Sequence, residues 1–310
     1  MNRVIVGLGE MLWDLFPEGR QMGGAPANFA YITSLLGNLG IAASRLGQDD
    51  LGREAVGRLT DLGLETTFLQ QDAEHPTGTV RVKVDEHGQP CFEISQSVAW
   101  DYLEWTPQWK ALAAQADAVC FGSLAQRSPE SQATIQSFLE ATRPQCLRIF
   151  DVNLRQNFYS AEILSASMKS ASVVKLNHEE LPKIMRLLAS GETFSGAGAE
   201  ESSARRLIEL YQLQLVCVTR GNHGSLLVRR TVCDAHPGFR VKVADTVGAG
   251  DAFTAALVRE YLRGASLAEM NETANQIGAW VASESGATPV PGPGGIDRRL
   301  MHIHQHRAFG

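Results

Sequence analysis

The residues best suited to chemistry stand in one short stretch, Gly248-Ala249-Gly250-Asp251. Glycines on both sides of Ala249 let the backbone turn successive N–H groups toward one concavity, which is a common way to bind an anion. An apolar run with helical spacing follows, so the stretch is predicted to begin a helix, whose dipole also favours an anion such as phosphate. Asp251 could act on a group bound there or could only complement the dipole, and this stretch leaves both interpretations open.

Two stretches near the N-terminus carry further polar candidates. Asp14 stands among large apolar residues, and because an ionised carboxylate is costly to bury alone, it either faces solvent or binds a polar group such as two sugar hydroxyls. Gly23 and Gly24 precede a helix predicted to end near residue 36, with Asn28 on its first turn. The Asn28 amide could bind a ligand lying against the glycine backbone, or it could serve as a structural cap.

The elements that must position these groups alternate along the chain. Buried strands are predicted at 4–9, 118–122, 147–152, 172–177 and 215–219, with helices between them that include 178–188 and 201–212. Continuous apolar strands alternating with helices indicate a largely parallel sheet covered on both faces, which binds ligands at the carboxyl ends of its strands. Polar residues follow those ends at 151–155, 177–180 and 219–224. Together with the glycine turn they supply the groups needed for Mg-nucleotide binding and phosphoryl transfer.

Two antiparallel pairs interrupt this alternation. Residues 79–85 and 91–94 alternate apolar and polar side chains around a turn, which predicts a hairpin in a small separate sheet that could form a lid. A second pair is predicted between 225–229 and 240–243.

The composition of the chain limits which kinds of protein it can be. The chain has 310 residues, 44% of them hydrophobic, and a net charge of −6 without a basic tract, so neither a nucleic acid nor a membrane surface is expected as a partner. Its five cysteines lack C-x-x-C spacing, the N-terminus reads as a strand rather than a signal segment, and roughly 18 consecutive apolar residues occur nowhere. We therefore expect a cytoplasmic globular protein.

Five motifs, taken in order, resemble those of the ribokinase-like, phosphofructokinase-B type carbohydrate kinases. They are GGAPAN at 23–28, Asp151-x-Asn153-x-Arg155, Asn177-x-x-Glu180, Thr219-x-Gly221-x-x-Gly224 and DTVGAGD at 245–251. The resemblance implies one ribokinase-like α/β domain over 1–310. It would be a three-layer α/β/α sandwich with a mostly parallel central sheet and a small β-sheet lid built from about 10–22 and 77–98.

The resemblance also implies roles for individual residues. Asp251 would be the catalytic base for the sugar hydroxyl, Gly248, Ala249 and Gly250 would form the anion hole, and Arg155 would be a further catalytic residue. The sugar would be bound by Asp14, Gly23, Gly24, Asn28, Phe92, Arg155 and Asp251. The nucleotide site would comprise Asn177, Thr219, Gly221, Gly224, Gly248, Gly250 and Asn275. The resemblance implies ATP as the phosphoryl donor. Mg²⁺ would be held by Glu180 through water, and Asp245 is a candidate ligand for K⁺. A homodimer formed through the lid is a further family expectation.

Among substrates, the resemblance favours a neutral ketohexose such as fructose, phosphorylated at a primary hydroxyl to fructose 6-phosphate. Ala25-Pro26 stands where ribokinases typically carry a lysine, and Glu93 after the lid Phe92 would repel the carboxylate of 2-keto-3-deoxygluconate. Alternatives are kinases for another sugar, such as ribose or 2-keto-3-deoxygluconate, or for a nucleoside, and a non-catalytic sugar-binding regulator. The hypothesis of a dinucleotide-dependent oxidoreductase rests only on Gly7-x-Gly9, which lacks the third glycine of the dinucleotide-binding motif.

Overall fold

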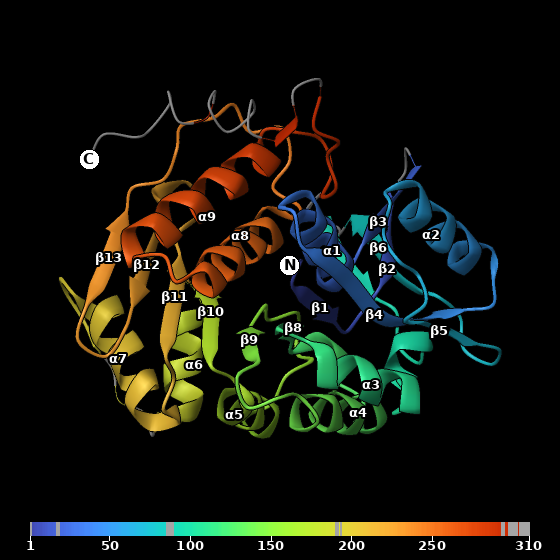
Figure 1. The fold of residues 1–310 in the computed structure, drawn as a ribbon, viewed down its shortest axis with the longest axis horizontal. Coiled ribbons are helices and arrows are strands. Elements are labelled where there is room, and N and C mark those ends of the chain that lie inside the picture. The colour runs from blue at the N-terminus through green and yellow to red at the C-terminus, as the bar shows by residue number, and fades with distance from the viewer. Residues whose placement is uncertain are drawn as a thin grey trace.

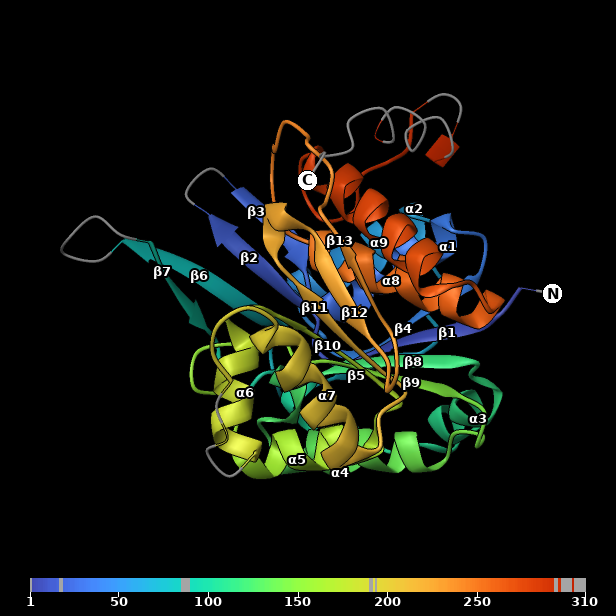
Figure 2. The ribbon, with the colours of Figure 1, turned by 90° about the vertical axis from the view of Figure 1, so that its left-hand side faces the viewer.

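A large sheet with helices on both faces forms the body of the protein, and a smaller sheet lies beside it (Figures 1 and 2). The computed structural model describes residues 2–16, 19–84, 90–189, 192, 194–292, 295–296 and 303. Within these residues the large sheet has nine strands in the order β13-β12-β11-β10-β9-β8-β1-β4-β5. Their bounds are β1 Val4–Leu8, β4 Leu39–Gly47, β5 Leu69–Asp72, β8 Ala118–Gly122, β9 Leu147–Asp151, β10 Val173–Asn177, β11 Leu215–Thr219, β12 Ser225–Val228 and β13 Cys233–His236.

The large sheet is mostly parallel, as predicted. Every neighbouring pair from β11 across to β5 is parallel, and only the pairs made by β12 are antiparallel. Helices α1 Ala25–Leu35, α2 Asp50–Asp61, α8 Ala249–Arg263 and α9 Leu267–Ala282 pack through one hydrophobic cluster on one face. Helices α3 Pro107–Gln115, α4 Pro129–Glu140, α5 Ala161–Ser170, α6 Glu180–Leu188 and α7 Ala199–Tyr211 share a second cluster on the other face. Both faces of the sheet are therefore buried, which explains the continuous apolar strands in the sequence.

Helix starts follow local signals. Ser128 accepts the N–H of Ser131 at 3.3 Å ahead of α4, and Pro129 fills its first position. Ser266 and Glu269 form a reciprocal capping box at the start of α9. Both starts were predictable because capping residues act over only three or four positions.

One predicted pairing is wrong. Strand β12 pairs with β13 at Cys233–His236 rather than with residues 240–243. The backbone N–H of Arg229 donates to the Val232 carbonyl at 2.8 Å, so a tight turn brings the nearer segment alongside β12. Local turn closure thus outcompetes the more apolar but more distant segment.

The smaller sheet has the order β3-β2-β6-β7 among the described residues. Its strands are β2 Leu12–Phe16, β3 Gly19–Gly23, β6 Gly78–Val84 and β7 Pro90–Ile94. Strands β6 and β7 pair antiparallel, which confirms the predicted hairpin, and β2 pairs parallel with β6. In Figure 2 the β6–β7 hairpin reaches out from the body of the molecule.

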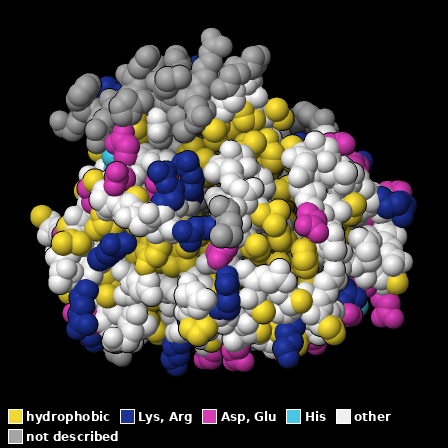
Figure 3. All heavy atoms as spheres, in the orientation of Figure 1, with side chains coloured by type: hydrophobic (Ala, Val, Ile, Leu, Met, Phe, Trp, Pro, Cys, Tyr) yellow, Lys and Arg dark blue, Asp and Glu magenta, His cyan; other side chains and the backbone are white. Residues whose placement is uncertain are grey.

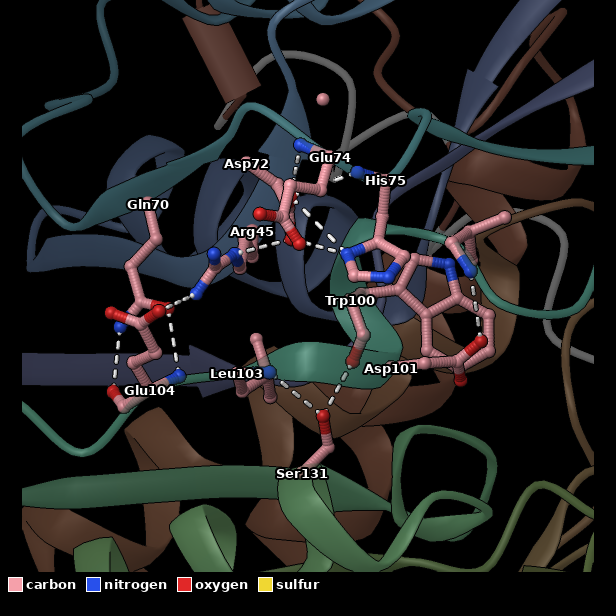
Figure 4. Close-up of polar contacts among 12 residues, drawn as sticks. Arg45, Gln70, Asp72, Glu74, His75, Trp100, Asp101, Leu103, Glu104 and Ser131 are labelled. Carbon is pink, nitrogen blue, oxygen red and sulfur yellow. Dashed lines mark hydrogen bonds and ion pairs between the residues drawn. The ribbon is translucent and has the colours of Figure 1, made fainter.

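Polar contacts fix the root of the smaller sheet, defined here as residues 72–77 and 95–101 (Figure 4). Before β6, the Asp72 carboxylate accepts the backbone N–H groups of Glu74 and His75 and pairs with Arg45 at 2.9 Å. After β7, Asp101 receives two bonds of 2.8 Å from Arg127, which also donates to the Ser95 carbonyl. The two ends of the hairpin are thus tied to the body by buried charge pairs.

We expect Arg127→Met to destabilise the fold strongly. The guanidinium lies 3.9 Å from the Trp100 ring centroid, and its loss leaves the buried Asp101 carboxylate without an ion partner. Breaking a buried pair in this way typically costs about 3–5 kcal/mol of unfolding free energy, measurable by chemical denaturation. Arg53→Met removes an exposed pair with Asp50 and should change stability little. Equal losses in the two variants would contradict the structural importance of the root.

Candidate active site

A cavity of about 990 Å³ opens at the carboxyl edge of the large sheet, between that edge and the smaller sheet. The smaller sheet contributes Leu12, Asp14, Val80 and Ile94 to its wall. The body of the protein contributes the first turn of α1, residues 153–156 after β9, Lys175 of β10 and residues 245–248, 250 and 251. Of the predicted site residues, it brings together Asp14, Gly23, Gly24, Asn28, Arg155, Asp245, Gly248, Gly250 and Asp251.

The glycine turn begins α8 as predicted. Gly248 has φ 76°, and a Cβ at this position would lie 2.5 Å from the Cβ of Ala287, so only glycine fits. The N–H of Ala249 reaches back to the Thr246 carbonyl at 3.3 Å, and the first intrahelical bond runs from Ala252 to Gly248. Among the described residues, the N–H groups of Gly250 and Asp251 find no acceptor. These two donors at the helix start are available to an anion.

Asp251 lies in the first turn of α8, where Asn28 Nδ2 donates to its carboxylate at 2.8 Å. Burial, and then the nearby Asp151 carboxylate, raises the pKa of Asp251 to about 6. The hydrogen bond from Asn28 and the charges of Lys175 and Arg155 act in the opposite direction. At pH 7 the group is therefore mainly a carboxylate but a better proton acceptor than an ordinary aspartate.

Two buried oxygen atoms in the same wall have no hydrogen-bond partner in the described part of the chain. They are Oε2 of Glu10 and Oδ1 of Asn28, and both residues line the cavity. Burial raises the pKa of Glu10 to about 7, with a smaller contribution from the Asp251 carboxylate. Buried polar atoms without a partner, in residues that line a cavity, are the kind of group that a polar ligand can satisfy.

The double glycine brings backbone close to two acidic residues. A Cβ on Gly23 would lie 2.6 Å from Oδ2 of Asp14, and one on Gly24 would lie 2.6 Å from the carbonyl oxygen of Glu10. Burial raises the pKa of Asp14, while the charge of Arg155 lowers it. Arg155 itself is exposed at the cavity wall. Phe92 belongs to β7, but its side chain lies outside the described residues.

Of the residues predicted for the nucleotide and magnesium, only Gly248 and Gly250 line this cavity; the others are Asn177, Glu180, Thr219, Gly221, Gly224 and Asn275. Asn177 pairs with Thr219 in the register of β10 and β11, and its Oδ1 accepts the N–H groups of Glu179 and Glu180. The Glu180 carboxylate accepts the N–H groups of Leu154 and Asn177, each at 2.8 Å. These bonds hold the ends of β9 and β10 in place.

The remaining candidates have mainly backbone or internal contacts. Gly221 and Gly224 have φ 58° and 76° in the turn between β11 and β12. Asn275 points into an internal network with Ser225 and Asn271, at 2.7 Å and 3.0 Å. Asp245 accepts the N–H groups of Val247 and Gly286, which ties residue 286 to the glycine turn. No group of three or more His, Cys, Asp or Glu within the described ranges forms a ready-made metal centre.

The model of the pfkB family carbohydrate kinases matches residues 18–292. The chain belongs to this family. It is 33% identical to a fructokinase of Salmonella typhimurium over 83% of this chain and 84% of that one. It is 29% identical to an aminoimidazole riboside kinase of Salmonella typhimurium strain LT2, covering 94% and 93% of the two chains. The structure of a fructokinase from Vibrio cholerae O395 with fructose, ADP and calcium superimposes with a TM-score of 0.78 at 26% identity, covering 98% and 99%.

The family and the fold class predicted from the motifs are thereby confirmed. In this carbohydrate kinase, no helix of the described chain has the length and apolar character needed to cross a membrane. Charged side chains on the face drawn in Figure 3 are scattered, with Lys and Arg interspersed among Asp, Glu and hydrophobic groups. Cys120, Cys146, Cys217 and Cys233 are free thiols.

Two further residues line the cavity that were not among the predicted site residues, Lys175 and Glu10. Lys175 bonds both carboxylate oxygens of Asp151 at 3.1 Å and lines the cavity. A single charged residue within the apolar strand VVKLN was a usable signal, because a lysine is seldom buried without a partner. Glu10 carried a similar signal in its apolar surroundings.

We expect Gly248→Ala to lose nucleotide binding as well as stability. An alanine there needs the left-handed conformation, at a cost of about 1–2 kcal/mol, and its Cβ also collides with Ala287. Gly264→Ala at the other end of α8 is a matched control, because Gly264 has φ 75° but open space around it. Thermal denaturation should therefore show losses in both variants, and calorimetric titration with ADP should show weakened binding in Gly248→Ala alone. Unchanged ADP affinity in Gly248→Ala would exclude the turn from the nucleotide site.

Proposed function

We propose that this kinase is an ATP-dependent fructokinase that converts fructose to fructose 6-phosphate. The observation that carries the proposal is the position of Asp251. Its carboxylate, with a pKa raised to about 6, stands one residue from the unpartnered N–H of Gly250 at a helix start. A proton acceptor and an anion site thus share one turn, at the wall of a cavity large enough for a sugar.

In the proposed reaction, the primary hydroxyl of the sugar attacks the γ-phosphorus of ATP. The bond from phosphorus to the bridging oxygen breaks, ADP leaves with the electron pair, and the hydroxyl proton moves to Asp251. Gly248, Ala249 and Gly250 form the turn, and the free N–H groups of Gly250 and Asp251 face the phosphoryl oxygens. Because the transition state is loose, the reaction depends more on orientation and charge stabilisation than on early deprotonation.

For the sugar, we propose contacts to Asp14, Asn28 and Arg155, with Gly23 and Gly24 letting the ligand approach the backbone and Phe92 contributing from the smaller sheet. The charges of the cavity support a neutral substrate. Its lining carries the acidic residues Glu10, Asp14, Asp245 and Asp251 against the basic residues Arg20, Arg155 and Lys175. An acidic sugar would meet several carboxylates, whereas the hydroxyls of fructose can donate to them.

For the nucleotide, we propose contacts to Asn177, Thr219, Gly221, Gly224 and Asn275 beside the glycine turn. Mg²⁺ would be bound chiefly through the nucleotide phosphates, with Glu180 acting through water, because both Glu180 oxygens already accept backbone N–H groups. Asp245 and nearby carbonyls are the proposed place for K⁺. Bound Mg²⁺ would neutralise phosphate charge.

A substrate panel tests this proposal. With Mg-ATP, we expect ADP release to be fastest with fructose, compared with ribose, glucose, 2-keto-3-deoxygluconate, adenosine and aminoimidazole riboside. Asp251→Asn should retain ADP affinity by calorimetry while losing most turnover, because only the proton acceptor changes. Preference for another member of the panel would correct the substrate, and no turnover with any of them would favour a non-catalytic regulator.

The acid limb of the pH profile should report Asp251. Since the carboxylate must be unprotonated to accept the hydroxyl proton and its pKa is about 6, kcat/KM should fall about tenfold per pH unit below about pH 6. Asn28→Leu removes the hydrogen bond that lowers this pKa and should move the limb to higher pH. Asp50→Asn, in the exposed first turn of α2, is the matched control and should leave the limb in place. A limb unaffected by Asn28→Leu would indicate that another group titrates.

A further inference from the structure

Lys175 lies directly beneath the anion-binding turn. It pairs in register with Asp151 across β10 and β9, and its side chain is 11% exposed. A Cβ on Gly250 would lie 3.1 Å from its Nζ, so the ammonium approaches the turn as closely as a glycine allows. The residue also lines the cavity that Asp251 and Gly250 border.

The Lys175 ammonium has three N–H donors, and its hydrogen bonds in the described structure use two of them. Asp151 accepts at 3.1 Å through each of its two oxygens, and no third acceptor for Lys175 occurs in the described part of the chain. Thr254, one turn into α8, also contacts the Asp151 carboxylate at 3.1 Å. Asp151 is therefore anchored to the helix that carries the turn, and it holds the ammonium in a fixed position with one N–H unused.

The charges around the Lys175 ammonium are mostly negative, so they favour a cation at this position. Carboxylates face the ammonium from β9 (Asp151), α8 (Asp251) and α6 (Glu180), while Glu10 lies across the cavity wall. Although burial opposes its charge, these neighbours raise the pKa of Lys175, so it remains an ammonium at neutral pH. Arg155, the other cation near Asp251, is exposed and screened by solvent. A phosphoryl group arriving beside several carboxylates needs a buried positive charge.

We propose that Lys175 is a further residue of the phosphoryl-transfer site, whose free N–H donates to an oxygen of the transferring phosphoryl group while Asp151 positions it. This inference rests on the proposed role of the glycine turn. Lys175 exchanges no proton in the step; the hydroxyl proton goes to Asp251, and the electron pair of the broken P–O bond goes to ADP. The ammonium meets only the charge of the phosphoryl oxygens, as a preorganised donor does in an oxyanion hole.

The alternative is that Lys175 only neutralises Asp151 in the core, and three variants separate the two roles. Lys175→Met leaves the Asp151 charge unpaired, Asp151→Asn leaves the ammonium without its anchor, and the double variant removes both charges. We expect Lys175→Met to lower kcat about 100-fold with little change in the KM for the sugar, and to lower the thermal midpoint. In the double variant the thermal midpoint should recover and kcat should stay low. A double variant with near wild-type kcat would overturn the inference.

A binding measurement keeps the test independent of the sugar. In calorimetry, ADP with aluminium fluoride, which imitates the transferring phosphoryl group, should bind the double variant about 100-fold more weakly than the wild type. ADP alone should bind both proteins equally. Equal binding of the fluoride complex by both proteins would refute the contact with Lys175. If the wild-type protein phosphorylates no sugar, the proposed fructokinase function fails separately, because the fluoride comparison still decides the role of Lys175.

Discussion

Keeping the carboxylate of Asp251 charged while it is buried is the constraint on which the site depends. Burial and the Asp151 carboxylate favour the protonated form, whereas Asn28, Lys175 and Arg155 favour the charged form. The helix start adds the N–H groups and dipole of α8, which also stabilise negative charge. Together these effects give Asp251 a pKa of about 6. This value is high enough for the carboxylate to accept a proton more readily than an ordinary aspartate, and low enough for it to be mainly ionised at neutral pH. Removing any one of these partners shifts this balance.

The parallel sheet explains how residues so distant in sequence reach one carboxylate. Strands β9 and β10 end at the same edge, so Asp151 and Lys175 face each other in register below α8. Helices α1 and α8 pack against each other on the same face, and this contact brings Asn28 to Asp251 across 223 positions of sequence. Each strand contributes only one or two polar groups, and the charge balance exists only in the assembled sheet.

Local features of this fold could be predicted from the sequence, whereas features that depend on which strands are neighbours could not. Capping and glycine positions act locally, so Ser266, Gly248 and the start of α8 were predictable. The β6–β7 hairpin followed from its alternation. Strand β4 was missed because LGIAASRLG is rich in Gly and Ala; its stability comes from pairing with β1 and β5, which is a tertiary effect. The Lys175–Asp151 pair was missed because it depends on which strands are neighbours. Asn177 and Glu180 were found from a motif, but their mutual capping geometry could not be inferred from it.

The smaller sheet also determines which side chains line the cavity. Asp14 of β2 reaches the cavity only because β2 and β3 extend away from the body, and β2 is held there by its parallel pairing with β6. Strand β6 in turn depends on the root, where Thr77 donates to Asp49 at the start of α2 and Arg127 binds Asp101 and Ser95. Arg127 also lies 4.6 Å from the ring centroid of Phe158, three residues beyond Arg155. The cavity-lining residues Asp14 and Arg155 are therefore connected through the root, so a change in the position of the hairpin would act on both sides of the cavity together.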